Sequence, residues 1–261
     1  MEKFEIKNRY GLKIVGELHI PENPIGLAFI EHGLGGFKEQ VSIVATVDTL
    51  VKNNYIVISF DATNSVGESD GKYEDATTQL HYEDLIDVIN WTKGESWYKE
   101  PFILVGSSLG GYSVVRYSEE NPKLVKGVFA KAPMVSGKFS FESNKKYNSA
   151  DFNSWKETGW IIRKSVSKPD IVKRLPWSHM EERLNHDLRT NVSKLIMPVV
   201  LIVGENDTSC PVSDQQALYD LIPKETYKEL HIIKDAPHTF KEEKDLNQLR
   251  SILDKWLKKL K

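Results

Sequence analysis

The feature that most constrains the fold is a series of short, nearly uninterrupted apolar runs. They are LAFIEHG, YIVISFD, FILVGS, VKGVFAKA and PVVLIVG, followed near the C-terminus by the more mixed ELHIIK. Runs of this length without polar alternation are typical of strands covered on both faces. The mixed run predicts a strand nearer an edge of the sheet. The chain is therefore expected to build a sheet that is buried between two layers.

Segments with helical spacing separate these runs. Apolar residues recur every three or four positions in three places: Ile43, Val47, Leu50 and Val51; Tyr82, Leu85, Ile86 and Ile89; and Leu246, Leu249, Leu253, Trp256 and Leu260. The opening EIKNRYGLKIVGELHI alternates instead, and predicts an antiparallel strand pair that turns near Tyr10-Gly11. Strands alternating with helices predict an α/β fold with a mostly parallel central sheet and helices on both faces.

Residues 134–195 interrupt this alternation. The segment is polar, aromatic and irregular, and it holds three of the six tryptophans, namely Trp155, Trp160 and Trp177. A structureless loop of this length is uncommon in a compact domain. We therefore expect one domain, residues 1–261, that carries residues 134–195 as an inserted, partly helical cap across one end of the sheet.

Charge and cysteine content exclude several classes of function. The chain has 35 basic and 37 acidic residues, a net charge of −2, which gives no overall field to attract nucleic acid or an anionic membrane. A mildly basic run, Lys164 to Lys168 with Lys173 and Arg174, is interpreted as solvated surface. No apolar run approaches the roughly 20 residues of a membrane span, and the charged start does not resemble a signal peptide.

The single cysteine, Cys210, excludes an internal disulfide and the common multi-cysteine zinc sites. No H-E-x-x-H motif occurs, so no metal site is expected. Cytoplasmic residence is the simplest interpretation. A homo-oligomer remains open, because neither the sheet edge nor the cap shows a decisive pattern.

The strongest catalytic motif is Gly106-Ser107-Ser108-Leu109-Gly110, which matches G-x-S-x-G. It follows the predicted strand FILV and precedes a predicted helix, the strand–turn–helix setting that this motif requires. A tight turn there presents the Ser108 hydroxyl at the end of the sheet. We predict Ser108 as a nucleophile.

A serine hydroxyl needs a base, and the base needs an acid to orient it. His238, in the loop after ELHIIK, is the predicted base among the seven histidines. Asp207, in the loop after PVVLIVG, is the predicted acid, with Glu205 as its rival. Asp61 is expected to hold its own loop through hydrogen bonds.

An oxyanion formed on the substrate needs fixed N–H donors. Leu109, the residue after the nucleophile, is expected to supply one. The second is expected from His32-Gly33-Leu34-Gly35-Gly36, a loop similar to the HGGG loop of esterases, with Leu34 preferred and Gly35 as the alternative. A phosphate-binding loop is excluded because no Gly-Lys-Ser/Thr follows.

Together these stretches resemble the α/β-hydrolase superfamily over nearly the whole chain, with the Ser–acid–His order of that superfamily. HGLGG, FDATNSVGESDGKYEDAT, and VGENDTSCPVSDQQALYD ahead of PHTF resemble bacterial feruloyl (cinnamoyl) esterases and related small carboxylesterases. In the second stretch, Asn64-Ser65-Val66-Gly67 replaces the usual Gly-His-Gly pattern. The resemblance implies hydrolysis of small-molecule carboxylic esters through an acyl-enzyme, without metal or cofactor.

The cap is expected to decide the substrate. Trp155, Trp160 and Trp177, with Tyr147, offer flat apolar surface for a pocket suited to small or aromatic acyl groups. Other activities of the same fold stay open: a lysophospholipase or monoacylglycerol lipase, an amidase or peptidase, or a non-catalytic receptor that binds a small ligand.

Overall fold

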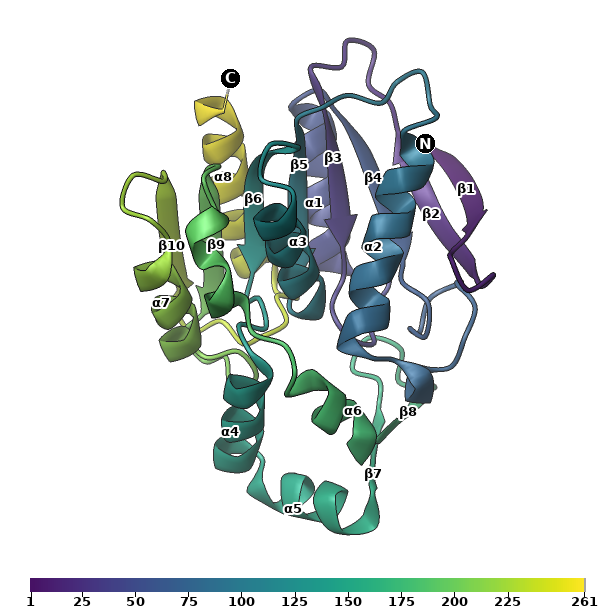
Figure 1. Ribbon diagram of the computed structural model, residues 1–261, viewed down its shortest axis with the longest axis vertical. Coiled ribbons are helices and arrows are strands. Elements are labelled where there is room, and N and C mark those ends of the chain that lie inside the picture. The colour runs from purple at the N-terminus through teal and green to yellow at the C-terminus, as the bar shows by residue number, and fades with distance from the viewer. Residues whose placement is uncertain (261) are drawn as a thin grey trace.

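The computed structural model describes residues 1–260, which form an eight-stranded sheet between two layers of helices (Figure 1). In spatial order the strands are β1 (Glu2–Lys7), β2 (Lys13–His19), β4 (Tyr55–Asp61), β3 (Gly26–Glu31), β5 (Phe102–Ser107), β6 (Val125–Lys131), β9 (Val199–Gly204) and β10 (Lys228–Ile233). The pairs β1–β2 and β2–β4 are antiparallel, and all the others are parallel. The predicted α/β architecture is confirmed, including β10 at an edge.

Both faces of the sheet are covered. In β3, Leu27 and Phe29 belong to one buried cluster, whereas Ala28 and Ile30 belong to another. The first cluster includes side chains from α2 (Thr78–Thr92), α3 (Leu109–Glu120) and α7 (Val212–Leu221); the second includes side chains from α1 (Val41–Lys52) and α8 (Glu243–Lys259). Because successive strand residues point to opposite faces, an uninterrupted apolar run serves two layers at once.

The segment between β6 and β9 forms a separate group of elements. It contains α4 (Gly137–Tyr147), α5 (Ser149–Thr158), β7 (Trp160–Lys164), β8 (Val172–Pro176), α6 (Trp177–Arg183), and the short 3₁₀ helices η2 (Leu188–Thr190) and η3 (Val192–Lys194). Strands β7 and β8 pair as an antiparallel hairpin. In Figure 1, α4, α5, α6 and this hairpin lie together beyond the ends of the central strands. Helix α5 ends at Gly159, whose φ of +77° is the left-handed conformation usual for such an end.

Among residues 1–260, none of the helices combines the length and apolar character needed to cross a bilayer.

Candidate active site

Ser108 occupies a strained turn between β5 and α3. Its φ is +56° and its ψ is −112°, a conformation that costs a non-glycine residue about 1–3 kcal/mol. The Ser108 N–H donates to the Lys131 carbonyl at 2.8 Å, and the Ser108 carbonyl accepts from the Tyr112 N–H at 3.0 Å. These bonds tie the turn to β6 and to the first turn of α3, so the hydroxyl is held at the end of the sheet.

The two motif glycines allow this turn because the backbone around them is crowded. A Cβ on Gly106 would lie 2.2 Å from the Gly110 carbonyl oxygen. A Cβ on Gly110 would lie 2.4 Å from the carbonyl oxygens of Glu31 and His32. Any side chain at either position would push α3 away from β5 and β3.

His238 and Asp207 reach Ser108 from loops that follow neighbouring strands, β10 and β9. The distance from His238 Nε2 to Ser108 Oγ is 3.0 Å, and from His238 Nδ1 to Asp207 Oδ2 it is 2.6 Å. Asp207 is buried, and its Oδ1 accepts the N–H groups of Ser209 and Cys210, both at 2.8 Å. A carboxylate only accepts, so His238 Nδ1 carries the proton and Nε2 is left to accept the serine hydroxyl.

The two other acids considered from the sequence lie elsewhere. Glu205 is exposed, and its carboxylate accepts the N–H of Asp235 at 3.0 Å rather than contacting His238. Asp61 is buried and accepts the N–H of Glu68 at 2.8 Å, which supports its own loop as expected. The structure therefore brings together Ser108, His238 and Asp207 and leaves these two acids out.

The loop after β3 is fixed by His32. Its Nε2 accepts the Ala62 N–H at 3.0 Å, so its Nδ1 carries the proton and donates to the Gly33 carbonyl at 2.8 Å. Burial is the main cause that lowers the pKa of His32, which favours this neutral form. The Gly36 N–H closes a turn onto the Gly33 carbonyl at 2.8 Å, and Gly35 takes a left-handed φ of +63°.

This turn leaves backbone donors beside the nucleophile. Leu34, Gly35 and Leu109 all line the cavity that contains Ser108. Within residues 1–260, the backbone N–H groups of these three residues make no hydrogen bond. They are available for an oxygen atom of a bound molecule.

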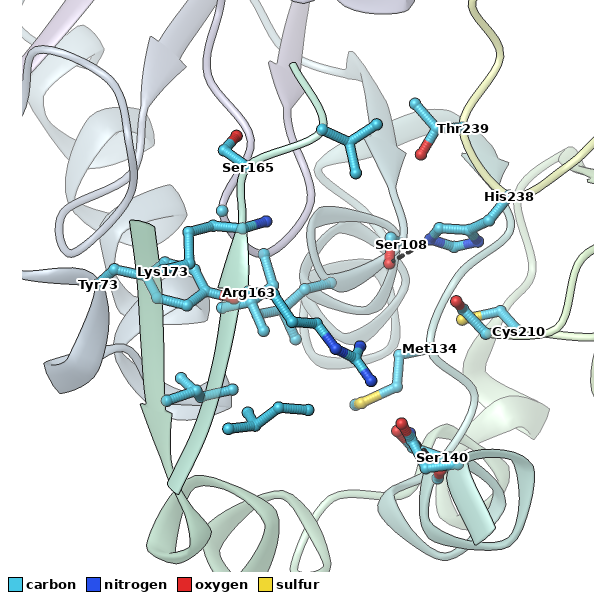
Figure 2. Close-up of a pocket in the computed structure, with 18 of the residues that line it drawn as sticks. Tyr73, Ser108, Met134, Ser140, Arg163, Ser165, Lys173, Cys210, His238 and Thr239 are labelled. Carbon is cyan, nitrogen blue, oxygen red and sulfur yellow. Dashed lines mark hydrogen bonds between the residues drawn. The ribbon is translucent and has the colours of Figure 1, made fainter. Parts of the chain in front are cut away.

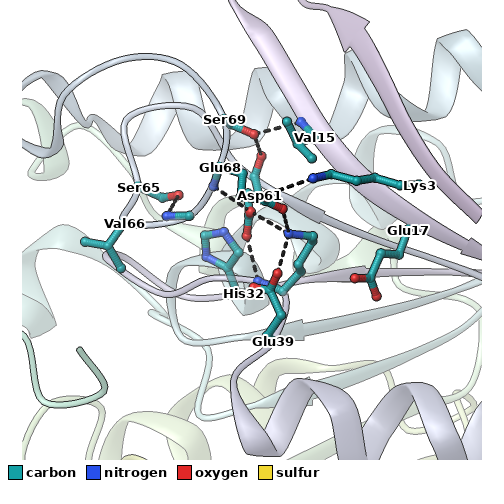
Figure 3. Close-up of polar contacts among 12 residues, drawn as sticks. Lys3, Val15, Glu17, His32, Glu39, Asp61, Ser65, Val66, Glu68 and Ser69 are labelled. Atoms are coloured by element: carbon teal, nitrogen blue, oxygen red, sulfur yellow. Dashed lines mark hydrogen bonds and ion pairs between the residues drawn. The ribbon is translucent and has the colours of Figure 1, made fainter.

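The buried Lys38 joins this loop to the loop after β4, and Figure 3 shows Asp61, Glu39 and Glu68 gathered there. The Lys38 ammonium is 3.1 Å from Asp61 Oδ2 and also contacts Glu39 and Glu68. Burial opposes the charge of Lys38, but its hydrogen bonds to the carboxylates outweigh burial and hold its pKa above the usual value. Oxygens of the three carboxylates lie within 4.8 Å of one another, and Lys38 supplies their positive countercharge.

A cavity of about 340 Å³ separates Ser108 from the cap. Figure 2 shows Ser108 and His238 on one side of it, and Tyr73, Lys173 and Arg163 on the other. The cap contributes to the lining from α4, α5, the β7–β8 hairpin and α6. The cap and the strand ends therefore form this cavity together.

Only one of the three predicted tryptophans lines the cavity, namely Trp155. Trp177 packs against Trp155 and Phe152, with ring centroids 5.3 Å and 5.5 Å apart, inside the cap's own core. Trp160 is exposed and lies under the Arg174 guanidinium, 4.4 Å from its ring centroid. The structure thus corrects the prediction for Trp160 and Trp177: the half-buried Trp177 ring packs against the cap core, and the Trp160 ring lies on the outer face of the cap. The exposed Tyr147 is also outside the lining.

The basic residues of the cavity were not predicted from the sequence, in which Lys173 was interpreted as solvated surface. In β8, Lys173 and Leu175 face the cavity, whereas Val172 and Arg174 are exposed. Val-Lys-Arg-Leu does not alternate between apolar and polar residues, so the sequence carries no period-2 signal that separates these two faces.

The chain resembles several known proteins. The family described as serine aminopeptidase, S33, matches residues 22–245. An uncharacterized 31.7 kDa protein of Escherichia coli, from the traX-finO intergenic region, is 26% identical over 271 residues, covering 92% of this chain and 93% of that protein. The bovine mitochondrial palmitoyl-protein thioesterase ABHD10 is 26% identical over 207 residues, or 78% of this chain and 63% of that protein.

The fold is also that of a solved structure, Est1E from Butyrivibrio proteoclasticus with ferulic acid bound. The TM-score is 0.79 at 19% identity, with 98% of each chain covered. The family match spans most of the chain, and the sheet order and helix layers are those of the same fold. The chain therefore belongs to the serine aminopeptidase S33 family and has the α/β-hydrolase fold.

Proposed function

We propose that this protein is a serine hydrolase that cleaves carboxylic esters of small or aromatic acyl groups through an acyl-enzyme intermediate. The observation that carries this proposal is the hydrogen-bonded series Ser108–His238–Asp207 at the wall of a cavity. In this arrangement a nucleophile, a base and an orienting acid lie within hydrogen-bond reach of one another.

In the proposed reaction, Ser108 Oγ attacks the carbonyl carbon while His238 Nε2 takes the hydroxyl proton. Asp207 holds the imidazole and stabilises its cation. The negative oxygen of the tetrahedral intermediate accepts the N–H groups of Leu34 and Leu109. The intermediate collapses as His238 returns the proton to the leaving alcohol. Water, activated by the same histidine, then releases the acid and regenerates Ser108.

The cavity supports a substrate of limited size. Its volume of about 340 Å³ lies at the small end of the usual range for small-molecule sites, about 300–1,000 Å³. Trp155, Ile161 and Leu175 offer apolar contact, while serine hydroxyls and cationic side chains occupy much of the remaining wall. This mixture favours a short or aromatic acyl group over a long alkyl chain.

A second candidate is hydrolysis of a thioester. The observation that favours it is the similarity to ABHD10, which is described as a palmitoyl-protein thioesterase. The same attack by Ser108 would release a thiol instead of an alcohol. The two candidates differ in the leaving group, an alcohol or a thiol. They also differ in the acyl group, which is small or aromatic in the first candidate and a palmitoyl chain in the second.

Labelling with a fluorophosphonate tests the nucleophile directly. The wild-type protein should be labelled at Ser108, and Ser108→Ala should not be labelled. Steady-state rates should then be measured on 4-nitrophenyl esters of increasing chain length, on methyl ferulate and on a palmitoyl thioester. Higher kcat/KM for short or aromatic esters supports the proposal, and a preference for the palmitoyl thioester replaces it with the second candidate. Labelling without turnover on any of them indicates a receptor.

A further inference from the structure

The cap side of the cavity presents hydrogen-bond donors and positive charge, and of its three cationic side chains only Arg163 is paired with an acid among the described residues. Its lining includes three cationic side chains, Arg163, Lys173 and Arg183, and the aromatic side chains of Tyr73 and Trp155. Within residues 1–260, no aspartate or glutamate belongs to the lining. Cationic side chains that are removed from water are normally paired with an anion.

Arg183 has neutral partners only. Its guanidinium donates to Ser140 Oγ at 2.9 Å and to His179 Nε2 at 2.7 Å. Its Nε is buried and has no hydrogen-bond partner. His179 accepts at Nε2 because its Nδ1 donates to the Ala76 carbonyl at 2.7 Å, so it adds no negative charge. No carboxylate in residues 1–260 is within ion-pair distance of Arg183.

Lys173 also lacks an anionic partner. Its ammonium lies 5.4 Å from the centroid of the Tyr73 ring, and it makes no hydrogen bond or ion pair within the described chain. A Cβ built on Gly35 would lie 3.2 Å from Lys173 Nζ, so this charge sits beside the loop that carries Leu34. Burial is the main cause that lowers the pKa of Lys173, followed by repulsion from Arg163.

The other polar side chains of the lining, those of Arg163, Trp155 and Tyr73, differ in whether they already have a hydrogen-bond partner. Arg163 is bound by Asp151, with N–O distances of 2.6 Å and 3.1 Å, in an exposed ion pair. Trp155 is 4% exposed, and its indole N–H has no hydrogen-bond partner. Burial raises the pKa of Tyr73 to about 12, so its hydroxyl keeps its proton at neutral pH and can donate. Among the described residues, Lys173 and Arg183 are therefore the two cationic side chains of the lining without a carboxylate partner.

We propose that the ester substrate carries an anionic group, a carboxylate or a phosphate, which binds between Lys173 and Arg183 while its ester carbonyl lies at Ser108. This inference rests on the proposed hydrolase function and narrows its substrate class. The anion supplies the negative charge that Arg183 and Lys173 lack among the described residues. Charge-assisted hydrogen bonds of this kind are the stronger ones in proteins.

Matched esters that differ only in charge test the proposal. On the acyl side, mono-4-nitrophenyl adipate is compared with 4-nitrophenyl adipamate, its uncharged amide. On the alcohol side, 4-carboxyphenyl hexanoate is compared with 4-carbamoylphenyl hexanoate. We expect the charged member of at least one pair to have the higher kcat/KM by about tenfold, the effect of one charge-assisted hydrogen bond. Ratios near one in both pairs overturn the proposal.

Head groups on the same four-carbon spacer identify the anion. The 4-nitrophenyl ester of 5-phosphonopentanoic acid distinguishes a phosphate site from a carboxylate site by its rate relative to the adipate ester. The corresponding 5-(trimethylammonio)pentanoate ester should be the poorest substrate of the series. If this cationic ester is hydrolysed as well as the adipate ester, the cavity does not select by charge.

Lys173→Met tests the residue, and Arg174→Met is its matched control on the exposed face of the same strand. Lys173→Met should lower the preference for the charged ester by about fivefold or more, through loss of one charge-assisted contact. Arg174→Met should leave the preference unchanged. If Lys173→Met lowers kcat/KM equally for the charged and uncharged esters, Lys173 stabilises the oxyanion instead, and the proposal is wrong.

A binding measurement separates this inference from the proposed function. In the Ser108→Ala variant, calorimetry should show tighter binding of the charged ligand in at least one pair, either monomethyl adipate against methyl adipamate or 4-carboxyphenyl hexanoate against 4-carbamoylphenyl hexanoate. Tighter binding of the anion without turnover by the wild type would support the anion site and reject the hydrolase. Turnover of esters with equal binding within both pairs would do the reverse.

Discussion

The two walls of the cavity differ in whether their charged groups have partners within the protein. On the strand side, the Asp207 carboxylate accepts two backbone N–H groups and His238, so its hydrogen-bonding capacity is used within the protein. On the cap side, Arg183 and Lys173 have no carboxylate partner among the described residues. On the strand side the acid is paired without a ligand, and the neutral backbone N–H groups of Leu34 and Leu109 are left for one. On the cap side, no anion among the described residues pairs with the charges of Arg183 and Lys173.

The same contrast appears in how each wall is held. The Ser108 turn keeps an unfavourable φ because strands β5 and β6 and helix α3 surround it. The cap instead relies on a small aromatic core around Trp155, Leu175 and Met180. The strand side is therefore expected to fix the chemistry. The cap, with its smaller core, is expected to set substrate choice and to be the easier part to disturb.

Removing the nucleophile should have the largest effect. Ser108→Ala should lower kcat by roughly 10⁵–10⁶-fold, as losses of a triad serine do. The fold should persist, because the hydroxyl adds little packing. The matched control is Ser107→Ala, one residue earlier in the same motif, which should keep most of the activity. Comparable losses in both variants would show that the turn, and not the Ser108 hydroxyl, is what matters.

Removing the charge of the orienting acid should have the next largest effect. Asp207→Asn should lower kcat by roughly 10³–10⁴-fold, because an amide no longer holds the histidine in the reactive tautomer. Glu205→Gln serves as control, since its carboxylate caps the Asp235 N–H instead. Steady-state kinetics on a short ester check both. A larger loss in Glu205→Gln than in Asp207→Asn would move the acid to Glu205.

The strand side was predictable from the sequence because its signals are local. Each triad candidate directly follows an apolar run, and the carboxyl ends of parallel strands meet at one edge of a sheet. Gly106 and Gly110 indicated the turn, because only glycine fits where the backbones approach so closely. Asp61 could be assigned to loop support because it ends the apolar run YIVISFD at the same edge of the sheet.

The cap was less predictable because its residues have no such constraint. Aromatic composition indicated a pocket but not which face each ring takes, so Trp160 and Trp177 were misplaced. Lys173 looked like surface because one basic residue in a short polar strand resembles any other. Its position depends on pairing with β7 across a hairpin, which composition does not reveal.

Disturbing the cap core should have a smaller effect than removing the triad. Trp177→Ala removes a ring that contacts Phe152 and Trp155, and should destabilise the protein by about 2–3 kcal/mol, less than full burial would give because the ring is half-buried. Trp160→Ala, on the exposed face, should change stability by about 0.5 kcal/mol or less. Urea unfolding measures both. Equal losses would mean that the cap has no core of its own.

The smallest expected effect is a pH dependence of stability that comes from His179, the hydrogen-bond acceptor of Arg183. Burial, with the nearby Arg183 charge, lowers the pKa of His179 to about 3 from the ordinary 6.5. Between these values the unfolded chain binds more protons than the folded one, so stability falls as the pH falls from 6.5 towards 3, by at most about 1.4 kcal/mol per pH unit. Burial also lowers the pKa of His81 to about 3, so His81 adds a similar pH dependence of stability.

His179→Gln keeps an acceptor for Arg183 but does not titrate, so it should remove one of the two contributions. The free energy of unfolding in urea should therefore fall less from pH 8 to pH 5 in the variant than in the wild type, by up to about 2 kcal/mol. Parallel curves from pH 8 to pH 5 would mean that Arg183 does not depend on a neutral His179, and that the cap wall tolerates a further positive charge without an anion.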